Sequence, residues 1–120
     1  MKLFAGLREI REYQRGELPF LRSLVEWDIV IEIGYAEERG DPITLKQLLL
    51  LNICSRTTLR RKLAQLNEQQ IVLRHKNSHD RRANMLVISH GTLRLLTRYG
   101  QMLKTISGMH FKRDRQVAGR

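Results

Sequence analysis

The side chains best suited to chemistry lie in a basic segment that runs from Ser55 to Leu66. Leucines recur in it at helical spacing, so one side of a helix turns inward and the other faces solvent. The outward side chains are Arg, Gln and Thr, the types that read base edges in duplex DNA. We expect base contacts from Arg56, Thr57, Thr58, Arg61 and Gln65.

Cations on both edges of this helix suit the phosphates that border a groove. We expect phosphate contacts from Ser55 at the helix start, from Arg60 and Lys62, and from Arg74 and Lys76 in the strand that follows. A solvated cationic helix surface is the alternative, and the helix taken by itself leaves both open.

A charged turn, Asp80-Arg81-Arg82, follows that strand and precedes a second apolar strand. Two arginines at a hairpin tip can enter a minor groove next to the helix, where arginine is favoured. We expect Asp80 to pair with one of them and to set the shape of the loop. A solvated turn with incidental charges remains the alternative.

Charge is distributed unevenly along the 120 residues, which carry a net charge of +10. Residues 1–40 hold six basic and eight acidic side chains, residues 41–90 hold nine and three, and residues 91–120 hold seven and one. An excess of positive charge confined to the last two thirds of the chain indicates a surface that binds a polyanion.

No apolar run approaches the roughly 20 residues of a membrane span, and charges come too early in the chain for a secretory signal. We therefore expect a cytoplasmic protein.

Other chemistry has little support in the sequence. The four histidines lack metal-ligand spacing and no carboxylate cluster joins them, so we expect no metal. Gly-rich phosphate loops and nucleophile–base signatures are absent, so we expect no cofactor and no enzymatic activity. Cys54 is the single cysteine, and either a small buried hydrophobe or a redox-sensing thiol fits it.

Periodicity and capping signals predict a mainly α chain with a small β-hairpin, arranged as a winged helix-turn-helix. Helices are expected over about 3–15, 19–38, 45–51, 56–69 and 91–107, and strands over 71–73 and 85–88. Pro19 fits the first turn of the second helix. Thr44, Ser55 and Ser89 can cap the third, fourth and last helices. The leucine run of the third helix predicts burial on several faces, and the apolar face of the last helix is expected to comprise Leu93, Leu96, Tyr99, Leu103 and Ile106. The second helix carries an apolar stripe of Phe20, Leu24, Trp27, Ile31 and Tyr35, although residues 29–33 are β-branched enough to form a strand. Residues 1–107 are predicted to form one domain, with the helix-turn-helix at about 44–69, the wing at about 71–88 and a basic tail at 108–120.

Residues 43–96 resemble the winged-helix core of the MarR (multiple antibiotic resistance regulator) family. The resemblance is carried by Ile43-Thr44-Leu45 with Gln47-Leu48, by Ser55 through Leu66, by Ile71-Val72 with Arg74 and Asp80-Arg81-Arg82-Ala83, and by Ser89-His90-Gly91. Gln70 stands where the family has a glycine, which predicts a differently built turn. Asn77-Ser78-His79 also differs from the usual wing tip.

This resemblance implies a sequence-specific regulator of transcription that binds double-stranded DNA as a homodimer. It implies a recognition helix in the major groove and a wing in the minor groove, with Arg81 and Arg82 as wing arginines and Asp80 as their structural partner. It implies nothing about a small-molecule effector. The alternative function is a winged-helix subunit of a protein or nucleoprotein complex, such as a replication or mobile-element accessory factor.

Overall fold

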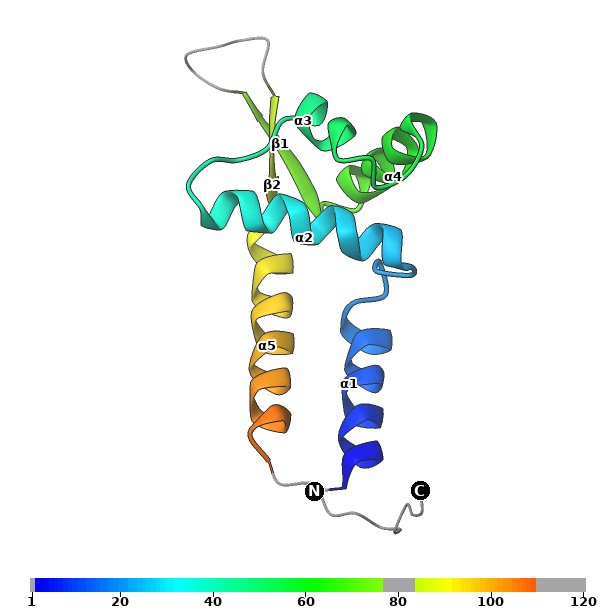
Figure 1. Ribbon diagram of the computed structural model, residues 1–120, viewed down its shortest axis with the longest axis vertical. Coiled ribbons are helices and arrows are strands. Elements are labelled where there is room, and N and C mark those ends of the chain that lie inside the picture. The colour runs from blue at the N-terminus through cyan, green and yellow to red at the C-terminus, as the bar shows by residue number, and fades with distance from the viewer. Residues whose placement is uncertain (1, 77–83, 110–120) are drawn as a thin grey trace. The chain divides into compact units, whose positions relative to one another are not determined.

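A computed structural model describes residues 2–76 and 84–109, and their contacts group into two compact units (Figure 1). One unit comprises residues 20–93, and the other combines residues 1–19 with the chain from residue 94 onward. The prediction of a single domain over residues 1–107 stays a prediction.

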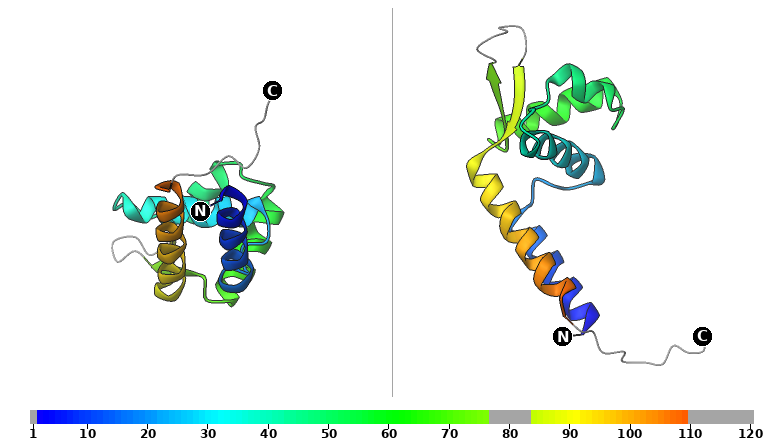
Figure 2. Two further views of the ribbon diagram at one scale, coloured as in Figure 1. Left: turned by 90° about the horizontal axis from the view of Figure 1, so that it is seen from below. Right: turned by 60° about the vertical axis from the view of Figure 1, so that its left-hand side comes forward.

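The unit of residues 20–93 holds three helices and a hairpin. Its elements are α2 (Leu24–Glu38), α3 (Leu45–Leu50), α4 (Arg56–Glu68), β1 (Val72–Lys76), β2 (Asn84–Ile88) and the start of α5 (His90–Ser107). The two strands pair antiparallel, with Val72 opposite Ile88. β2 packs against α2 and α3, whereas β1 packs against α4 (Figures 1 and 2). The predicted mainly α fold with a small hairpin is therefore confirmed.

The core of this unit is built around α4. Its leucines Leu59, Leu63 and Leu66 are at most 2% exposed, as their spacing predicted. They share the core with apolar side chains of the other helices and of both strands: Ile29, Val30, Ile33, Leu48, Val72, Leu86 and Ile88. One face of α4 is therefore held inward over its length, and the opposite face is left to solvent.

α2 begins at Leu24, five residues later than the sequence predicted for this helix. Ser23 is its N-cap, and the Ser23 amide and hydroxyl both donate to Glu26 Oε1 at 2.6 Å. The start predicted near residue 19 was therefore wrong, because the Ser23–Glu26 capping box, and not Pro19, sets the helix start. The helix preferred over a strand for residues 29–33 is confirmed.

The apolar stripe predicted for α2 lies mostly on its outer side. Leu24 is 79% exposed, Ile31 53% and Tyr35 55%. The buried positions are Ile29, Val30, Ile33 and Ala36. Because α2 carries apolar residues on nearly every side, periodicity alone could not tell which side packs against β2.

α3 is short and capped as predicted. The Gln47 amide donates to the Thr44 hydroxyl at 3.2 Å, and the Thr44 amide donates to Gln47 Oε1 at 2.9 Å. Burial on several faces, predicted from its leucine run, was wrong: Leu48 is fully buried, but Leu50 is 64% and Leu51 47% exposed. The chain leaves the core directly after Leu48, through a turn in which Asn52 has φ 55°.

The end of α4 is closed by a Schellman motif. The Ile71 amide donates to the Leu66 carbonyl at 2.9 Å, and the Gln70 amide donates to the Asn67 carbonyl at 3.0 Å. Gln70 has φ 61°, the left-handed conformation that glycine normally supplies. The prediction of a differently built turn was therefore wrong, because glutamine adopts the glycine geometry.

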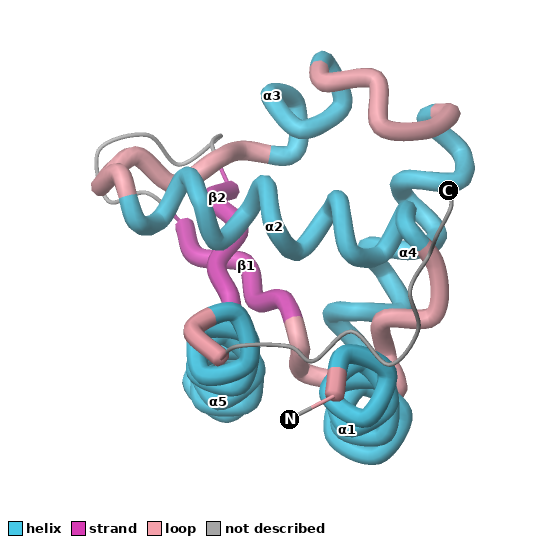
Figure 3. Tube along the Cα trace, turned by 60° about the horizontal axis from the view of Figure 1, so that its bottom comes forward, coloured by secondary structure: helices cyan, strands magenta, loops and turns pink. Residues whose placement is uncertain are grey.

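The second unit pairs α1 (Leu3–Glu17) with residues 94–107 of α5, side by side and antiparallel (Figures 1 and 3). The Tyr13 hydroxyl donates to the Leu95 carbonyl at 2.8 Å, and the Tyr13 and Tyr99 rings stack with centroids 6.3 Å apart. Ile10 and Ile106 are 8% exposed. In the part of the chain that the structure describes, no helix has the length and apolar character that crossing a membrane requires.

Ser89 caps α5, as predicted, because the Thr92 amide donates to its hydroxyl at 3.4 Å. The predicted apolar face of α5 is buried in part. Ile106 is 8% exposed, whereas Leu93 is 51% and Leu103 41% exposed.

We expect Gln70→Gly to stabilise the chain, since a left-handed residue other than glycine costs roughly 1–2 kcal/mol. The greater freedom of glycine in the unfolded chain offsets part of this gain, which leaves about 0.5–1 kcal/mol. Urea unfolding of both proteins measures the change. Gln69→Gly is the matched control, because Gln69 has φ −81° and gains nothing from glycine. An equal effect of the two substitutions would contradict strain at Gln70.

Candidate nucleic-acid interface

The N-cap of α4 is Ser55, which is hydrogen-bonded to Thr58. The Thr58 amide donates to the Ser55 hydroxyl at 3.2 Å, and that hydroxyl donates to Thr58 Oγ1 at 2.9 Å. Ser55 is exposed, whereas Thr58 is half-buried. The structure thus brings both predicted site residues to the helix start, with the Thr58 hydroxyl engaged in holding the cap.

The outward side of α4 carries the predicted polar and cationic side chains. The exposed members are Arg56, Thr57, Arg60, Arg61 and Gln65. Within residues 2–76 and 84–109, none of these side chains has a hydrogen-bond or ion-pair partner. These side chains therefore form a row of hydrogen-bond donors without partners among the described residues, on a helix whose other side is buried in the core. Their contacts with a nucleic acid stay a prediction.

Lys62 forms an ion pair that the sequence did not predict. Its ammonium forms an ion pair with Glu26 of α2, and the two side chains are 18% and 8% exposed, respectively. The phosphate contact of Lys62 stays a prediction, and its ammonium is already paired with a buried carboxylate. The pair joins the first turn of α2 to the middle of α4.

Glu26 is the residue at this site that sequence reasoning missed. Burial of its carboxyl raises the pKa, but the hydrogen bonds from Lys62 and Ser23 outweigh it and hold the pKa below its ordinary value of 4.5. The Glu26 carboxylate is therefore charged at neutral pH and fully engaged. The signal was present in the sequence as a serine followed three residues later by a glutamate, the pattern of a capping box.

The structure describes some of the site residues predicted in the hairpin and not others. Arg74 is exposed on β1, opposite Leu86 of β2, and Lys76 is the last residue of β1. Asp80, Arg81 and Arg82 lie outside the described residues. Their roles in the wing stay predictions.

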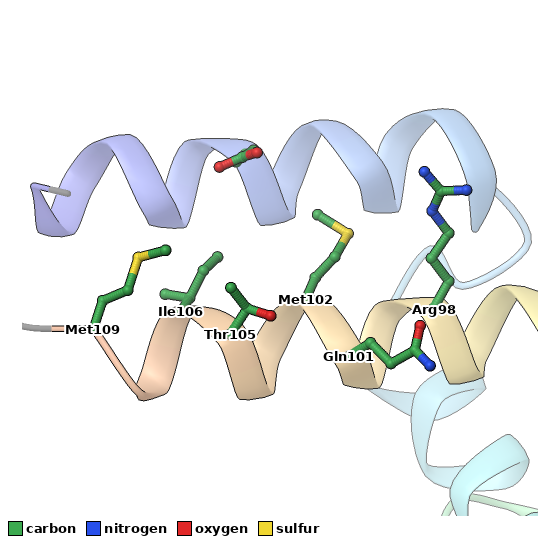
Figure 4. A pocket seen from close by; sticks show the side chains of 7 residues that line it. Arg98, Gln101, Met102, Thr105, Ile106 and Met109 are labelled. Carbon is green, nitrogen blue, oxygen red and sulfur yellow. The ribbon is translucent and has the colours of Figure 1, made fainter.

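A pocket of about 410 Å³ lies between α1 and α5 in the second unit (Figure 4). Its lining comprises Glu9, Arg98, Gln101, Met102, Thr105, Ile106 and Met109. The methionines and Ile106 line its α5 side, and one carboxylate and one guanidinium supply charge. Among residues 2–76 and 84–109, no three His, Cys, Asp or Glu side chains are grouped so that they could hold a metal ion.

The chain is similar to solved structures of transcription regulators. MarR from E. coli is 18% identical over 83% of this chain and 73% of that chain, with a TM-score of 0.56. A regulator from Thermotoga maritima is 24% identical over 84% and 75%, with a TM-score of 0.55. The repressor CouR, bound to a 23-mer DNA duplex, is 16% identical over 84% and 68%, also with a TM-score of 0.55.

No protein-family model matches the chain, and no curated protein matches it. The similarity to solved structures establishes the fold: this chain has the winged-helix fold of the MarR-type structures.

We expect Glu26→Gln to destabilise the chain by about 2–3 kcal/mol at pH 7, because it removes the charge that faces Lys62. A lowered pKa means that the unfolded chain binds more protons, so this stabilisation is present above pH 4.5 and is lost as the pH falls through the folded-state pKa. Urea unfolding at several pH values should show the difference between the two proteins shrinking in acid. Glu38→Gln, at an exposed carboxylate of the same helix, is the control and should change little.

Proposed function

We propose that the chain is a transcription regulator that binds double-stranded DNA and presents α4 to the major groove. The observation that carries this proposal is the row of exposed, uncommitted side chains along α4, on the side opposite its buried leucines. A neighbour in fold is a repressor bound to a DNA duplex, which supports the same partner. The net charge of +10 favours association with a polyanion.

The side chains of α4 divide into two roles. Arg61 and Gln65 lie on its exposed side, where guanidinium and amide groups can reach base edges, with Arg56, Thr57 and Thr58 nearer the helix start. Phosphate contacts come from Ser55 and Arg60 of the helix and from Arg74 and Lys76 of β1. Arg81 and Arg82 enter the minor groove, and Asp80 orders the loop that carries them.

We also propose that two copies of the chain associate through the α1–α5 unit. Phe4 is 78% exposed, and Leu3, Leu7 and Leu103 are each more than 40% exposed. Exposed apolar surface of this kind is typical of association sites. The open pocket beside Met102 and Ile106 offers further apolar surface on the same unit. A homodimer is also what the resemblance to MarR regulators implies.

A protein-interaction module is the second candidate function. The exposed apolar stripe of α2, formed by Leu24, Ile31 and Tyr35, favours it, because α4 and the hairpin do not cover that stripe. This function predicts negligible binding to duplex DNA even at low salt, and that result would replace our first proposal.

Binding of duplex DNA tests the proposed function. The wild type should bind random duplex with an affinity that falls steeply as salt rises, since cationic side chains displace counterions from phosphates. On a preferred sequence selected from a random library, Arg61→Ala should lose about 1–3 kcal/mol and discriminate less against random duplex. Arg60→Ala should weaken binding to both duplexes alike and flatten the salt dependence. Fluorescence anisotropy at several salt concentrations measures all three proteins.

Arg8→Ala controls for the loss of one positive charge, since Arg8 lies on α1 and pairs there with Glu12 at 3.0 Å. If Arg61→Ala lost as much affinity for random duplex as for the preferred duplex, as is expected of Arg60→Ala, the division of roles on α4 would be contradicted.

Light scattering after gel filtration tests association. The wild type should have twice the 14.1 kDa mass of one chain. Phe4→Glu should shift the population toward the monomer, because it places a charge in an apolar interface, whereas Phe4→Leu should preserve the dimer. A wild-type monomer at every concentration would contradict the proposed dimer.

A further inference from the structure

A second pocket, of about 300 Å³, lies between the start of α2 and the side of α4. Its lining is mostly polar and comprises Phe20, Arg22, Ser23, Glu26, Arg61, Lys62, Gln65, Leu66 and Gln69. Figures 1 and 3 both show the beginning of α2 next to α4. The pocket is therefore lined on one side by residues 20–26, from the acidic first third of the chain, and on the other by the basic helix α4.

Two positive charges in this pocket have no counter-charge among the residues that the structure describes. Glu26 and Lys62 neutralise each other through their ion pair. Arg22 and Arg61 are exposed, and neither has a hydrogen-bond or ion-pair partner among residues 2–76 and 84–109. The amide and hydroxyl of Ser23 already donate to Glu26. The free donors are therefore the two guanidiniums and the side-chain amides of Gln65 and Gln69.

Arg61 and Gln65 are assigned to base edges, which leaves Arg22 and Gln69 as the donors for a phosphate group in the pocket. Guanidinium binds phosphate through paired N–H donors, and the Gln69 amide can supply a further hydrogen bond. An anion between Arg22 and Arg61 would also offset the repulsion between their like charges. A pocket that is open to solvent suits a phosphate that remains part of a larger molecule.

We propose that this pocket binds a backbone phosphate of the duplex that α4 enters, and that Arg22 is a phosphate-binding residue. The inference rests on the proposed function, since it deepens the description of the same interface. Arg61 and Gln65 both line the pocket and lie on the exposed side of α4, so a phosphate in the pocket borders the groove that α4 would read. The interface therefore extends beyond the helix-turn-helix and the wing to the segment before α2.

The test measures binding of random-sequence duplex by the full chain over a range of salt concentrations. Arg22→Ala should weaken binding roughly 3- to 10-fold near 0.1 M salt and reduce the slope of log affinity against log salt by about 0.9, the contribution of one phosphate contact. Arg22→Glu should weaken binding further. Arg39→Ala is the matched control, since Arg39 is an exposed arginine at the other end of α2 and lies over the Tyr35 ring.

The outcomes separate the two proposals. A wild type that does not bind duplex at low salt overturns the proposed function and this inference with it. A wild type that binds with a steep salt slope, while Arg22→Ala matches Arg39→Ala, overturns this inference and leaves the proposed function standing. A loss specific to Arg22→Ala, with unchanged thermal unfolding, supports the pocket as a phosphate site.

A second measurement uses inorganic phosphate as a competitor, compared with chloride at equal ionic strength. If the pocket binds the phosphate group itself, phosphate should displace duplex from the wild type more strongly than chloride does. This excess should disappear in Arg22→Ala and persist in Arg39→Ala. An excess of the same size in both variants would place the phosphate elsewhere and overturn the inference.

Discussion

The buried ion pair between Glu26 and Lys62 is the constraint on which the proposed interface depends. Glu26 accepts hydrogen bonds from Ser23 as well as from Lys62, so one carboxylate starts α2 and ties it to α4. Buried ion pairs add little net stability, because the cost of removing both charges from water opposes their attraction. Removing one partner, however, destabilises the fold strongly, because the other charge stays buried without a counter-charge. The pair therefore acts mainly on geometry. With Lys62 drawn toward α2, Arg61 and Gln65 remain on the exposed side.

Two neighbouring cations on one basic helix thus have different roles. Arg61 is exposed and uncommitted, whereas Lys62 is largely buried and paired. Both are basic, and their positions on the helix differ by about 100°, so the sequence indicated only that they face different ways. Which one meets a buried carboxylate depends on where α2 crosses α4. That crossing is also what brings Arg22 to the wall of the same pocket.

Periodicity and capping residues predicted most of the helices and strands. Where these predictions were wrong, the cause is either a missed local signal or a contact made in the tertiary structure. The caps at Thr44, Ser55 and Ser89 were predicted correctly because a hydroxyl one residue before a helix acts over a single turn. The capping box at Ser23 was overlooked, which misplaced the start of α2 by five residues. At Gln70 the chain adopts a left-handed conformation against the preference of glutamine. Leu66 and Ile71, the two apolar positions of the Schellman motif, are both buried, and burial of these two positions often accompanies this turn.

The sequence by itself determined the order of helices and strands, the inward leucines of α4 and the polar character of its outward side. These features follow from spacing and from interactions within a few residues. The tertiary structure decided which side of α2 is buried, which cation of α4 is paired and that Arg22 lies beside Arg61. Each of these depends on contacts between segments far apart in the chain. An apolar stripe such as Leu24, Ile31 and Tyr35 specifies a helix, but its burial is decided by what packs against it.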